Sequence, residues 1–127
     1  MTIVVTAAII ERDGRFLMAR RLKGTHLEGL WEFPGGKIEP GESLEACLAR
    51  ELDEELGVPC RVGRLRLATA HEYPGRRVEL HFFDCEIDGD PRPLLGQELR
   101  WVGASELASL PLPEADAGLV ALLTAPR

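Results

Sequence analysis

The sequence contains few cysteines, and their arrangement excludes two classes of small protein. Cys47, Cys60 and Cys85 are odd in number and scattered along the chain, with no CxxC motif and no paired Cys and His residues. This excludes a disulfide-stapled scaffold and a structural zinc site, because both need partners at short, regular spacings. We expect the three thiols to be reduced and buried, and the protein to be cytoplasmic.

Long apolar runs and an excess of basic residues are also missing. No stretch approaches the length of a transmembrane helix, and the apolar, β-branched start is expected to form a strand rather than a signal peptide. With 15 basic and 21 acidic residues the net charge is −6, which argues against a nucleic-acid duplex or an anionic membrane as partner. A phosphorylated small molecule remains compatible, since a bound divalent cation would supply the missing positive charge.

Internal repeats, low-complexity tracts and linkers are absent as well, so residues 1–127 are expected to form one domain. The hydrophobic pattern predicts strands at 3–11, 16–20, 60–71, 77–86 and 100–102. Asp13-Gly14 predicts a hairpin turn between the first two strands. Helices are predicted between Ser43, a capping residue, and Gly57, a terminating glycine, and from Pro113 to about Leu123.

The predicted helix after Ser43 carries Glu51, Glu54 and Glu55, at positions i, i+3 and i+4. Residues at this spacing lie on one face of a helix, so their carboxylates are expected to converge on one patch. Like charges so placed repel by roughly 0.2–0.5 kcal/mol per pair, and folding alone gains nothing from them. Hard divalent cations such as Mg²⁺ prefer carboxylate, carbonyl and water oxygens. The helix is therefore interpreted as a metal-binding platform.

A glycine loop precedes this helix, and the two together make a long motif. From Gly36 to Val58 the sequence follows the pattern Gly-x5-Glu-x7-Arg-Glu-Leu-x-Glu-Glu-x-Gly-Val. With every defining position filled, the chain resembles the Nudix hydrolases. The resemblance implies an α/β (α+β) fold, the Nudix-type α/β/α sandwich with a mixed β-sheet. The predicted mixture of strands and flanking helices agrees with it.

The Nudix resemblance also implies roles for residues of the motif. It assigns Glu51, Glu54 and Glu55 to metal binding, together with the carbonyl oxygen of Gly35. The implied cofactor is Mg²⁺, with Mn²⁺ as an alternative. Either Glu51 or Glu54 would in addition deprotonate or position the attacking water, and Arg50 would orient a glutamate through hydrogen bonds.

Two neighbours of the glutamates have simpler explanations that need weighing. Arg50 lies four residues before Glu54, so it is also suited to an ordinary surface ion pair of little energetic value. Glu42 is expected to brace the loop rather than to bind the metal directly.

The resemblance extends over nearly the whole chain and is closest to the MutT branch, which cleaves oxidised nucleoside triphosphates. It rests on Arg21, His26 and the run Trp-Glu-Phe-Pro-Gly-Gly-Lys at 31–37. On this match Arg21 and His26 would contact phosphate, and Phe33 would line the base pocket, with Tyr73 as a weaker match. The structural alternatives are an exposed arginine and a loop histidine.

Two positions depart from the MutT pattern. Where MutT proteins read the purine edge with an asparagine this chain has Asp116, and there it resembles the CTP pyrophosphohydrolases. An ionised aspartate only accepts hydrogen bonds, which suits N4 of cytosine but equally N7–H of 8-oxoguanine. The acidic ligand that some relatives place six residues before the tryptophan is Leu95 here, with Glu98 as a candidate substitute.

We therefore expect a nucleotide-pool-sanitising enzyme in which water attacks the β-phosphorus of a nucleoside triphosphate and releases the monophosphate and pyrophosphate. The expected substrates are oxidised nucleotides such as 8-oxo-dGTP, or cytidine nucleotides. One alternative is cleavage of another nucleoside diphosphate derivative, ADP-ribose or a dinucleotide. Another is a nucleotide-sensing domain without turnover, but such domains typically lack a motif glutamate. The expected partner is a small nucleotide, with no nucleic acid and no membrane, and the chain is expected to be a monomer or a homodimer.

Overall fold

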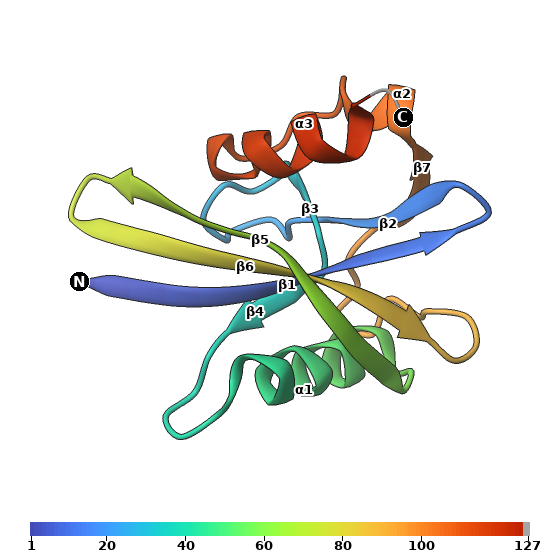
Figure 1. The fold of residues 1–127 in the computed structure, drawn as a ribbon, viewed down its shortest axis with the longest axis horizontal. Coiled ribbons are helices and arrows are strands. Elements are labelled where there is room, and N and C mark those ends of the chain that lie inside the picture. The colour runs from blue at the N-terminus through green and yellow to red at the C-terminus, as the bar shows by residue number, and fades with distance from the viewer. Residues whose placement is uncertain (126–127) are drawn as a thin grey trace.

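The computed structural model describes residues 1–125, in which a seven-stranded sheet separates two helical layers (Figure 1). The strands are β1 (Thr2–Arg12), β2 (Arg15–Arg20), β3 (Trp31–Glu32), β4 (Gly35–Lys37), β5 (Cys60–Tyr73), β6 (Arg76–Ile87) and β7 (Leu99–Gly103). The helices are α1 (Leu44–Leu56), α2 (Ala104–Leu107), the 3₁₀ helix η1 (Glu114–Asp116) and α3 (Ala117–Thr124). No helix of this described part is long and apolar enough to span a bilayer.

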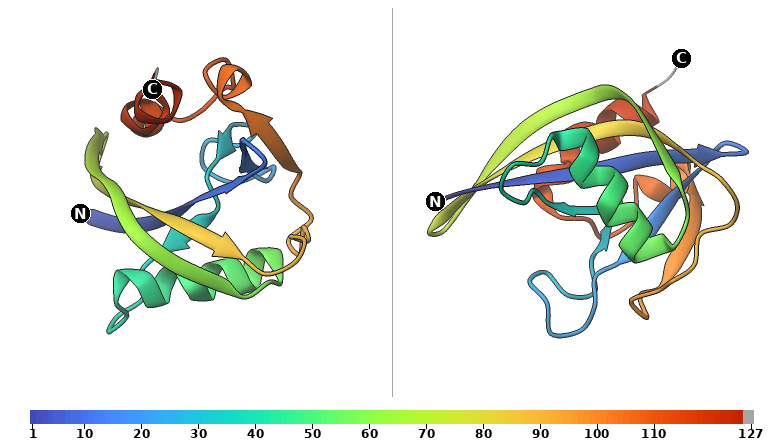
Figure 2. Two further views of the ribbon diagram at one scale, coloured as in Figure 1. Left: turned by 45° about the vertical axis from the view of Figure 1, so that its right-hand side comes forward. Right: turned by 90° about the horizontal axis from the view of Figure 1, so that it is seen from below.

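Strand β1 organises the sheet, whose order is β3-β2-β1-β6-β5, with β4 paired to β1 and β7 paired to β2. The β1–β6 pair is parallel and the others are antiparallel, so the sheet is mixed, as predicted. Helix α1 covers one face and α3 the other, which the turned views also show (Figure 2). The predicted α/β/α sandwich is confirmed.

The apolar run in β1 is continuous because both of its faces are buried. Ala7 and Ile9 point into a core cluster that includes Leu119 of α3. Ala8 and Ile10 point into a second cluster with Leu48, Leu52 and Leu56 of α1. Because side chains alternate along a strand, a single run of residues supplies both cores.

Local signals in the sequence fix the turns and the ends of α1. The hydroxyl of Ser43 accepts a hydrogen bond from the backbone N–H of Ala46, and Gly57 ends the helix with φ 66°. Asp13 and Gly14 have φ 53° and 76° between paired Arg12 and Arg15, which is the geometry of a tight type I′ hairpin. These predicted features are confirmed.

The last helix begins differently from its prediction. The expected helix from Pro113 starts as the 3₁₀ turn η1 and becomes α-helical only at Ala117. The tighter turn buries Ala115 and Asp116 against the sheet. It also brings Pro113, Ala115 and Asp116 to the wall of a cavity.

Candidate active site

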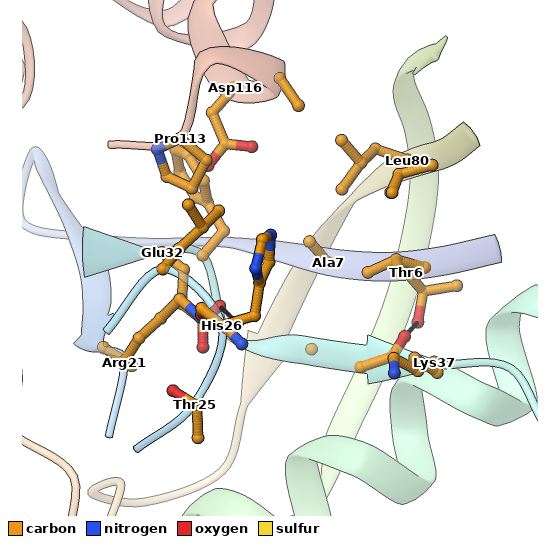
Figure 3. A pocket seen from close by; sticks show the side chains of 18 of the residues that line it. Thr6, Ala7, Arg21, Thr25, His26, Glu32, Lys37, Leu80, Pro113 and Asp116 are labelled. Carbon is orange, nitrogen blue, oxygen red and sulfur yellow. Dashed lines mark hydrogen bonds and ion pairs between the residues drawn. The ribbon is translucent and has the colours of Figure 1, made fainter. Parts of the chain in front are cut away.

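A cavity of about 460 Å³ opens between the α3 side of the sheet, the loop after β2 and the glycine strand β4. Its volume lies within the range of small-molecule sites. The apolar wall is made by residues from β1, β6 and the strand connection after β3, namely Val5, Ala7, Phe33, Val78, Leu80 and Phe82. Figure 3 looks into it, with Asp116 and Pro113 near η1 and with Arg21, Thr25 and His26 from the loop.

Glu51 and Glu55 reach the cavity from α1, and the two glycines of β4 line it beside them. A Cβ at Gly36 would overlap the carboxylate of Glu51. A Cβ at Gly35 would overlap the backbone of Thr6 in the neighbouring strand. Both glycines are therefore required by close approach, one to a carboxylate and one to β1.

Both glutamates have raised pKa values, mainly because they are buried. Burial raises the pKa of Glu55 to about 8, and the charges of Glu51 and Glu32 add to the effect, while the backbone N–H of Gly35 opposes it. Burial likewise raises the pKa of Glu51, with Arg50 opposing it. Both carboxyl groups at the β4 edge of the cavity therefore hold their protons more tightly than free glutamates do.

Glu54 departs from the expected convergence of three carboxylates. Its side chain is 56% exposed and pairs with Arg50, with Nη1 and Oε2 3.3 Å apart, and it does not line the cavity. Among residues 1–125, no three acidic, His or Cys side chains are grouped so as to hold a metal by themselves. The structure therefore brings two of the three predicted glutamates to the cavity and leaves the third at its rim.

The donor set nevertheless fits a Mg²⁺ ion. Magnesium is usually held by one or two carboxylates, water molecules and substrate phosphates rather than by a complete protein cage. Glu51 and Glu55 supply two hard oxygen donors side by side, and their raised pKa values indicate a place that favours added positive charge.

Arg50 is the hub of the carboxylate cluster. Its Nε donates to Glu42 at 2.7 Å and its Nη1 donates to Glu51 at 3.0 Å. Glu42 also accepts from the backbone N–H of Glu39 at 2.9 Å, so it braces the loop before α1. These hydrogen bonds hold the pKa of Glu42 down at about 2. The simple surface pair of Arg50 with Glu54 is only one part of this network.

Positive groups gather at the mouth of the cavity around His26. Partial desolvation, followed by the charges of Arg76, Arg21 and Lys37, lowers the pKa of this histidine. At neutral pH His26 is therefore an uncharged hydrogen-bonding group among three cations. Such an arrangement suits the phosphates of an anionic ligand.

Arg21 is engaged within the protein rather than free. Its Nη1 lies 2.6 Å from the Glu32 carboxylate, and its Nε donates to the backbone carbonyl of His26. The guanidinium thus fixes the loop after β2 while it lines the cavity. This ion pair holds Glu32 in the cavity wall. The sequence had predicted no role for Glu32 in the site.

Asp116 lines the cavity from η1, whereas Glu51 and Glu55 line it from α1, and Asp116 is only 5% exposed. Burial, and then the charge of Glu32, raises its pKa to about 7. Although it stands at the start of α3, its side chain makes no capping hydrogen bond. Helix capping therefore does not account for this aspartate.

Tyr73 and Phe33 close two sides of the cavity. The ring of Tyr73 meets His26 edge to face, with centroids 5.8 Å apart, so the end of β5 touches the loop after β2. Phe33 packs edge to face on Phe82, also at 5.8 Å, within the core wall. Both predicted pocket residues line the cavity.

Gln97 is a site residue that the sequence analysis missed. Its Nε2 donates to the backbone carbonyl of Glu55 at 3.1 Å, and its Oε1 accepts from the N–H of Leu95 at 2.9 Å. It thereby ties the end of α1 to the loop before β7. No local pattern predicts such a glutamine, because its partner Glu55 lies on a distant helix.

The two candidate positions for a further acidic ligand lie in the same loop. Leu95 lines the cavity with 51% exposure, whereas the carboxylate of Glu98 pairs with Arg20 at 3.6 Å.

Comparisons with known proteins place this geometry in context. A family model described as NUDIX domain matches residues 5–122. The chain is 41% identical over 126 residues to the CTP pyrophosphohydrolase of Escherichia coli, covering 98% of this chain and 93% of that one. It is 36% identical over 120 residues to the 8-oxo-dGTP diphosphatase of Haemophilus influenzae, covering 93% and 88%. The crystal structure of the MutT protein from Methanosarcina mazei superposes with a TM-score of 0.86 at 28% identity, covering 96% and 92%.

Proposed function

The chain belongs to the NUDIX domain family of hydrolases, and from this we propose that it is a Mg²⁺-dependent nucleoside triphosphate pyrophosphohydrolase. It converts a nucleoside triphosphate and water into the monophosphate and pyrophosphate. Its substrates are oxidised nucleotides such as 8-oxo-dGTP or cytidine nucleotides, the two classes that appear in the names of its relatives. In this role the protein removes unwanted nucleotides from the pool.

One observation carries the proposal: a single cavity joins an apolar, carboxyl-bearing end to a cationic mouth and an acidic edge. A nucleobase has an apolar face and a hydrogen-bonding edge, which match the apolar wall and Asp116. The phosphates match the cations around His26. Glu51 and Glu55 line the same cavity, which supports a metal between them and the phosphates.

Nudix hydrolases generally require a divalent metal, and here Mg²⁺, or alternatively Mn²⁺, is the proposed ion. Glu51, Glu55 and the carbonyl oxygen of Gly35 would hold it, with Glu54 completing the set from the rim. The ion would neutralise phosphate charge and polarise the bond to be broken.

The remaining chemistry falls to the side chains of α1. Hydrolysis joins the oxygen of water to the β-phosphorus and breaks the bond from that phosphorus to the oxygen shared with the α-phosphorus. Either Glu51 or Glu54 takes up the proton of the water as a general base. Arg50 positions Glu51 through the hydrogen bond at 3.0 Å and keeps that carboxylate oriented toward the cavity.

The residues of the cavity divide the recognition of the substrate. Arg21 and His26 contact the phosphates, while Phe33 and Tyr73 line the base pocket. Asp116 reads the edge of the base, a role supported by its burial and by the absence of a capping hydrogen bond.

Residues 1–127 act as one domain in the cytoplasm, as monomer or homodimer, and three free thiols suit a reducing compartment. The ligand is a small nucleotide rather than a nucleic acid or a membrane.

A substrate panel tests the proposed function. The purified protein is incubated with Mg²⁺ and 8-oxo-dGTP, dGTP, CTP, dCTP or ADP-ribose, and the products are separated and identified. We expect monophosphate and pyrophosphate from one or more triphosphates, with loss of activity in excess chelator and in Glu51→Gln, which also controls for contaminating hydrolases. Faster cleavage of ADP-ribose than of every triphosphate, or full activity in excess chelator, would overturn the proposal.

A further inference from the structure

A buried polar contact lies directly behind the acidic edge of the cavity, which is formed by Glu51 and Glu55. The hydroxyl oxygen of Thr6 and the sulfur of Cys47 are 3.3 Å apart, and neither residue has any exposed surface. They come from β1 and α1, far apart in the sequence. A hydroxyl in a protein interior is costly unless it is hydrogen-bonded, so the partners of this pair decide what it does.

Those partners are the backbone of Gly36 and the side chain of Arg50. The register of β1 and β4 sets Thr6 opposite Gly36, whose carbonyl oxygen lies 3.5 Å from the Thr6 hydroxyl and 3.8 Å from the Cys47 sulfur. An N–H of Arg50 points at the same sulfur from 3.9 Å. Arg50 can donate to Cys47, Cys47 to Thr6, and Thr6 to Gly36, so every donor in the chain has an acceptor.

Both ends of this chain of contacts support Glu51. Its carboxylate rests on the Cα of Gly36, where any Cβ would overlap it. The same carboxylate accepts a hydrogen bond from Arg50 at 3.0 Å. Movement of the Gly36 backbone or of the guanidinium would therefore move Glu51. It would also move the carbonyl oxygen of Gly35, a proposed metal ligand, because that carbonyl belongs to the peptide bond that joins Gly35 to Gly36.

We propose that Thr6 and Cys47 are positioning residues for the metal-binding edge, by which we mean Glu51, Glu55 and the Gly35 carbonyl. They hold this edge by linking Arg50 to the Gly36 carbonyl through the buried hydroxyl and thiol. This inference rests on the proposed function, because it concerns the same edge of the cavity. Thr6 lies in the cavity wall and Cys47 does not, and the effect is transmitted through the backbone of β4 and through Arg50 rather than by contact with the substrate.

A purely space-filling role is the simpler explanation, and it makes a different prediction. Valine has nearly the shape of threonine, so if Thr6 only fills space, Thr6→Val should leave the metal-binding edge unchanged. If Thr6 has a positioning role, Thr6→Val should instead lower the metal affinity. Loss of a group that orients metal ligands typically lowers this affinity about 10-fold to 100-fold.

The first test measures Mn²⁺ binding to the substrate-free protein by the loss of the electron paramagnetic resonance signal of free Mn²⁺. Thr6→Val is compared with Thr6→Ser, which keeps the hydroxyl and removes only a methyl group. We expect the dissociation constant to rise about 10-fold in Thr6→Val and to stay within about 2-fold of the parent in Thr6→Ser. Equal affinity in Thr6→Val and the parent overturns the proposal.

The second test removes the thiol and uses another buried cysteine as a matched control. Cys47→Ala is expected to weaken Mn²⁺ binding, whereas Cys85→Ala should not, because the Cys85 thiol contacts the carbonyl of Phe83 in β6 and residues of β5 such as Cys60. In the double variant with Thr6→Val the losses should be less than additive, because both changes break one chain of contacts.

The outcomes separate this inference from the proposed function. A parent protein that neither binds Mn²⁺ nor hydrolyses a triphosphate overturns both. A parent that does both, with variants of unchanged affinity, overturns the inference alone. Unfolding of Thr6→Val and Cys47→Ala, seen by circular dichroism, also contradicts it, because the contact would then be structural.

Discussion

At the scale of single residues, Asp116 is the residue proposed to read the edge of the base. Its carboxyl group is buried in the cavity, lacks a capping role and has a pKa raised to about 7 by burial and by Glu32. Near neutral pH it therefore exists in two forms, an ionised acceptor and a neutral group that can donate as well. The nucleobase that Asp116 recognises should therefore depend on which of these hydrogen bonds the carboxyl group makes.

Asp116→Asn should change the preferred nucleotide far more than overall turnover. Asparagine always offers a donor that can meet O6 of 8-oxoguanine, so discrimination should move toward 8-oxo-dGTP and away from cytidine nucleotides. A well-placed hydrogen bond in a dry pocket contributes about 1–3 kcal/mol, so the ratio of the two kcat/KM values should move roughly tenfold or more. The measurement is kcat/KM for both substrates at pH 8, where the parent carboxyl is mainly ionised. An unchanged ratio would remove Asp116 from base recognition.

Glu54 gives a second prediction at this scale, because it is proposed as a ligand or base although it lies at the rim. Glu54→Gln should lower kcat by more than about tenfold, equivalent to some 1.4 kcal/mol of barrier. The melting temperature should hardly change, since exposed ion pairs contribute little to stability. Asp53→Asn, an exposed acidic neighbour on the same helix, serves as the control. A smaller loss than tenfold in kcat would take Glu54 off the catalytic list.

At the scale of elements, the short strand β4 is the piece that brings the acidic helix and the sheet together. Its two glycines face different neighbours, Gly35 the backbone of β1 and Gly36 the Glu51 carboxylate. A backbone neighbour cannot move aside, whereas a flexible side chain can. The two glycines should therefore respond differently to the same substitution.

Gly36→Ala should keep the fold and lose activity, while Gly35→Ala should lose stability. The new methyl group at position 36 displaces Glu51 from the metal-binding edge, and the one at position 35 disrupts the pairing of β4 with β1. Gly103→Ala is the control, because its Cβ would meet nothing nearby. Melting curves and kcat, measured together on all three variants, provide the comparison. If Gly36→Ala retains full activity, Glu51 does not depend on that close approach.

Local patterns predicted most of these elements, and the misses have a common physical cause. The Ser43 cap, the Gly57 terminus and the Asp13-Gly14 turn depend on neighbouring residues only, so sequence was sufficient for them. The helical spacing predicted a shared face for the glutamates and suggested the ion pair of Arg50 with Glu54, but it did not predict that Glu54 would stay outside the cavity.

Long-range partners account for the rest. The pairing of Glu32 with Arg21, and of Gln97 with the end of α1, depends on how separate elements pack. The position of Asp116 could be matched to relatives from the sequence, but its raised pKa depends on burial and then on the charge of Glu32, and both arise only in the folded chain.

At the scale of the whole molecule, the buried carboxyl groups link stability to pH. Asp116 normally loses its proton near pH 3.8 but keeps it to about pH 7 in the folded protein. Between these values the native state binds the extra proton, so the free energy of unfolding falls as pH rises. Glu42, with its pKa lowered to about 2, acts in the opposite sense, but only below pH 4.5.

The parent protein should therefore melt at a lower temperature at pH 8 than at pH 5.5, and Asp116→Asn should show a smaller decrease. We expect the two decreases to differ by about 3 °C or more, the shift that roughly 1 kcal/mol produces in a domain of this size. Thermal melts of both proteins in excess chelator make the comparison, since contributions such as that of Glu55 are common to both. Parallel decreases would show that Asp116 is ionised in the folded protein across this range.

This molecule is proposed to direct water at an internal phosphorus of a nucleoside triphosphate, and the fate of labelled water tests that reaction most directly. The reaction is run with Mg²⁺ in ¹⁸O-water, without added pyrophosphatase, and the products are analysed by mass spectrometry. Attack at the β-phosphorus places the ¹⁸O in pyrophosphate and leaves the monophosphate unlabelled. Label in released orthophosphate, accompanied by the nucleoside diphosphate, would contradict the account.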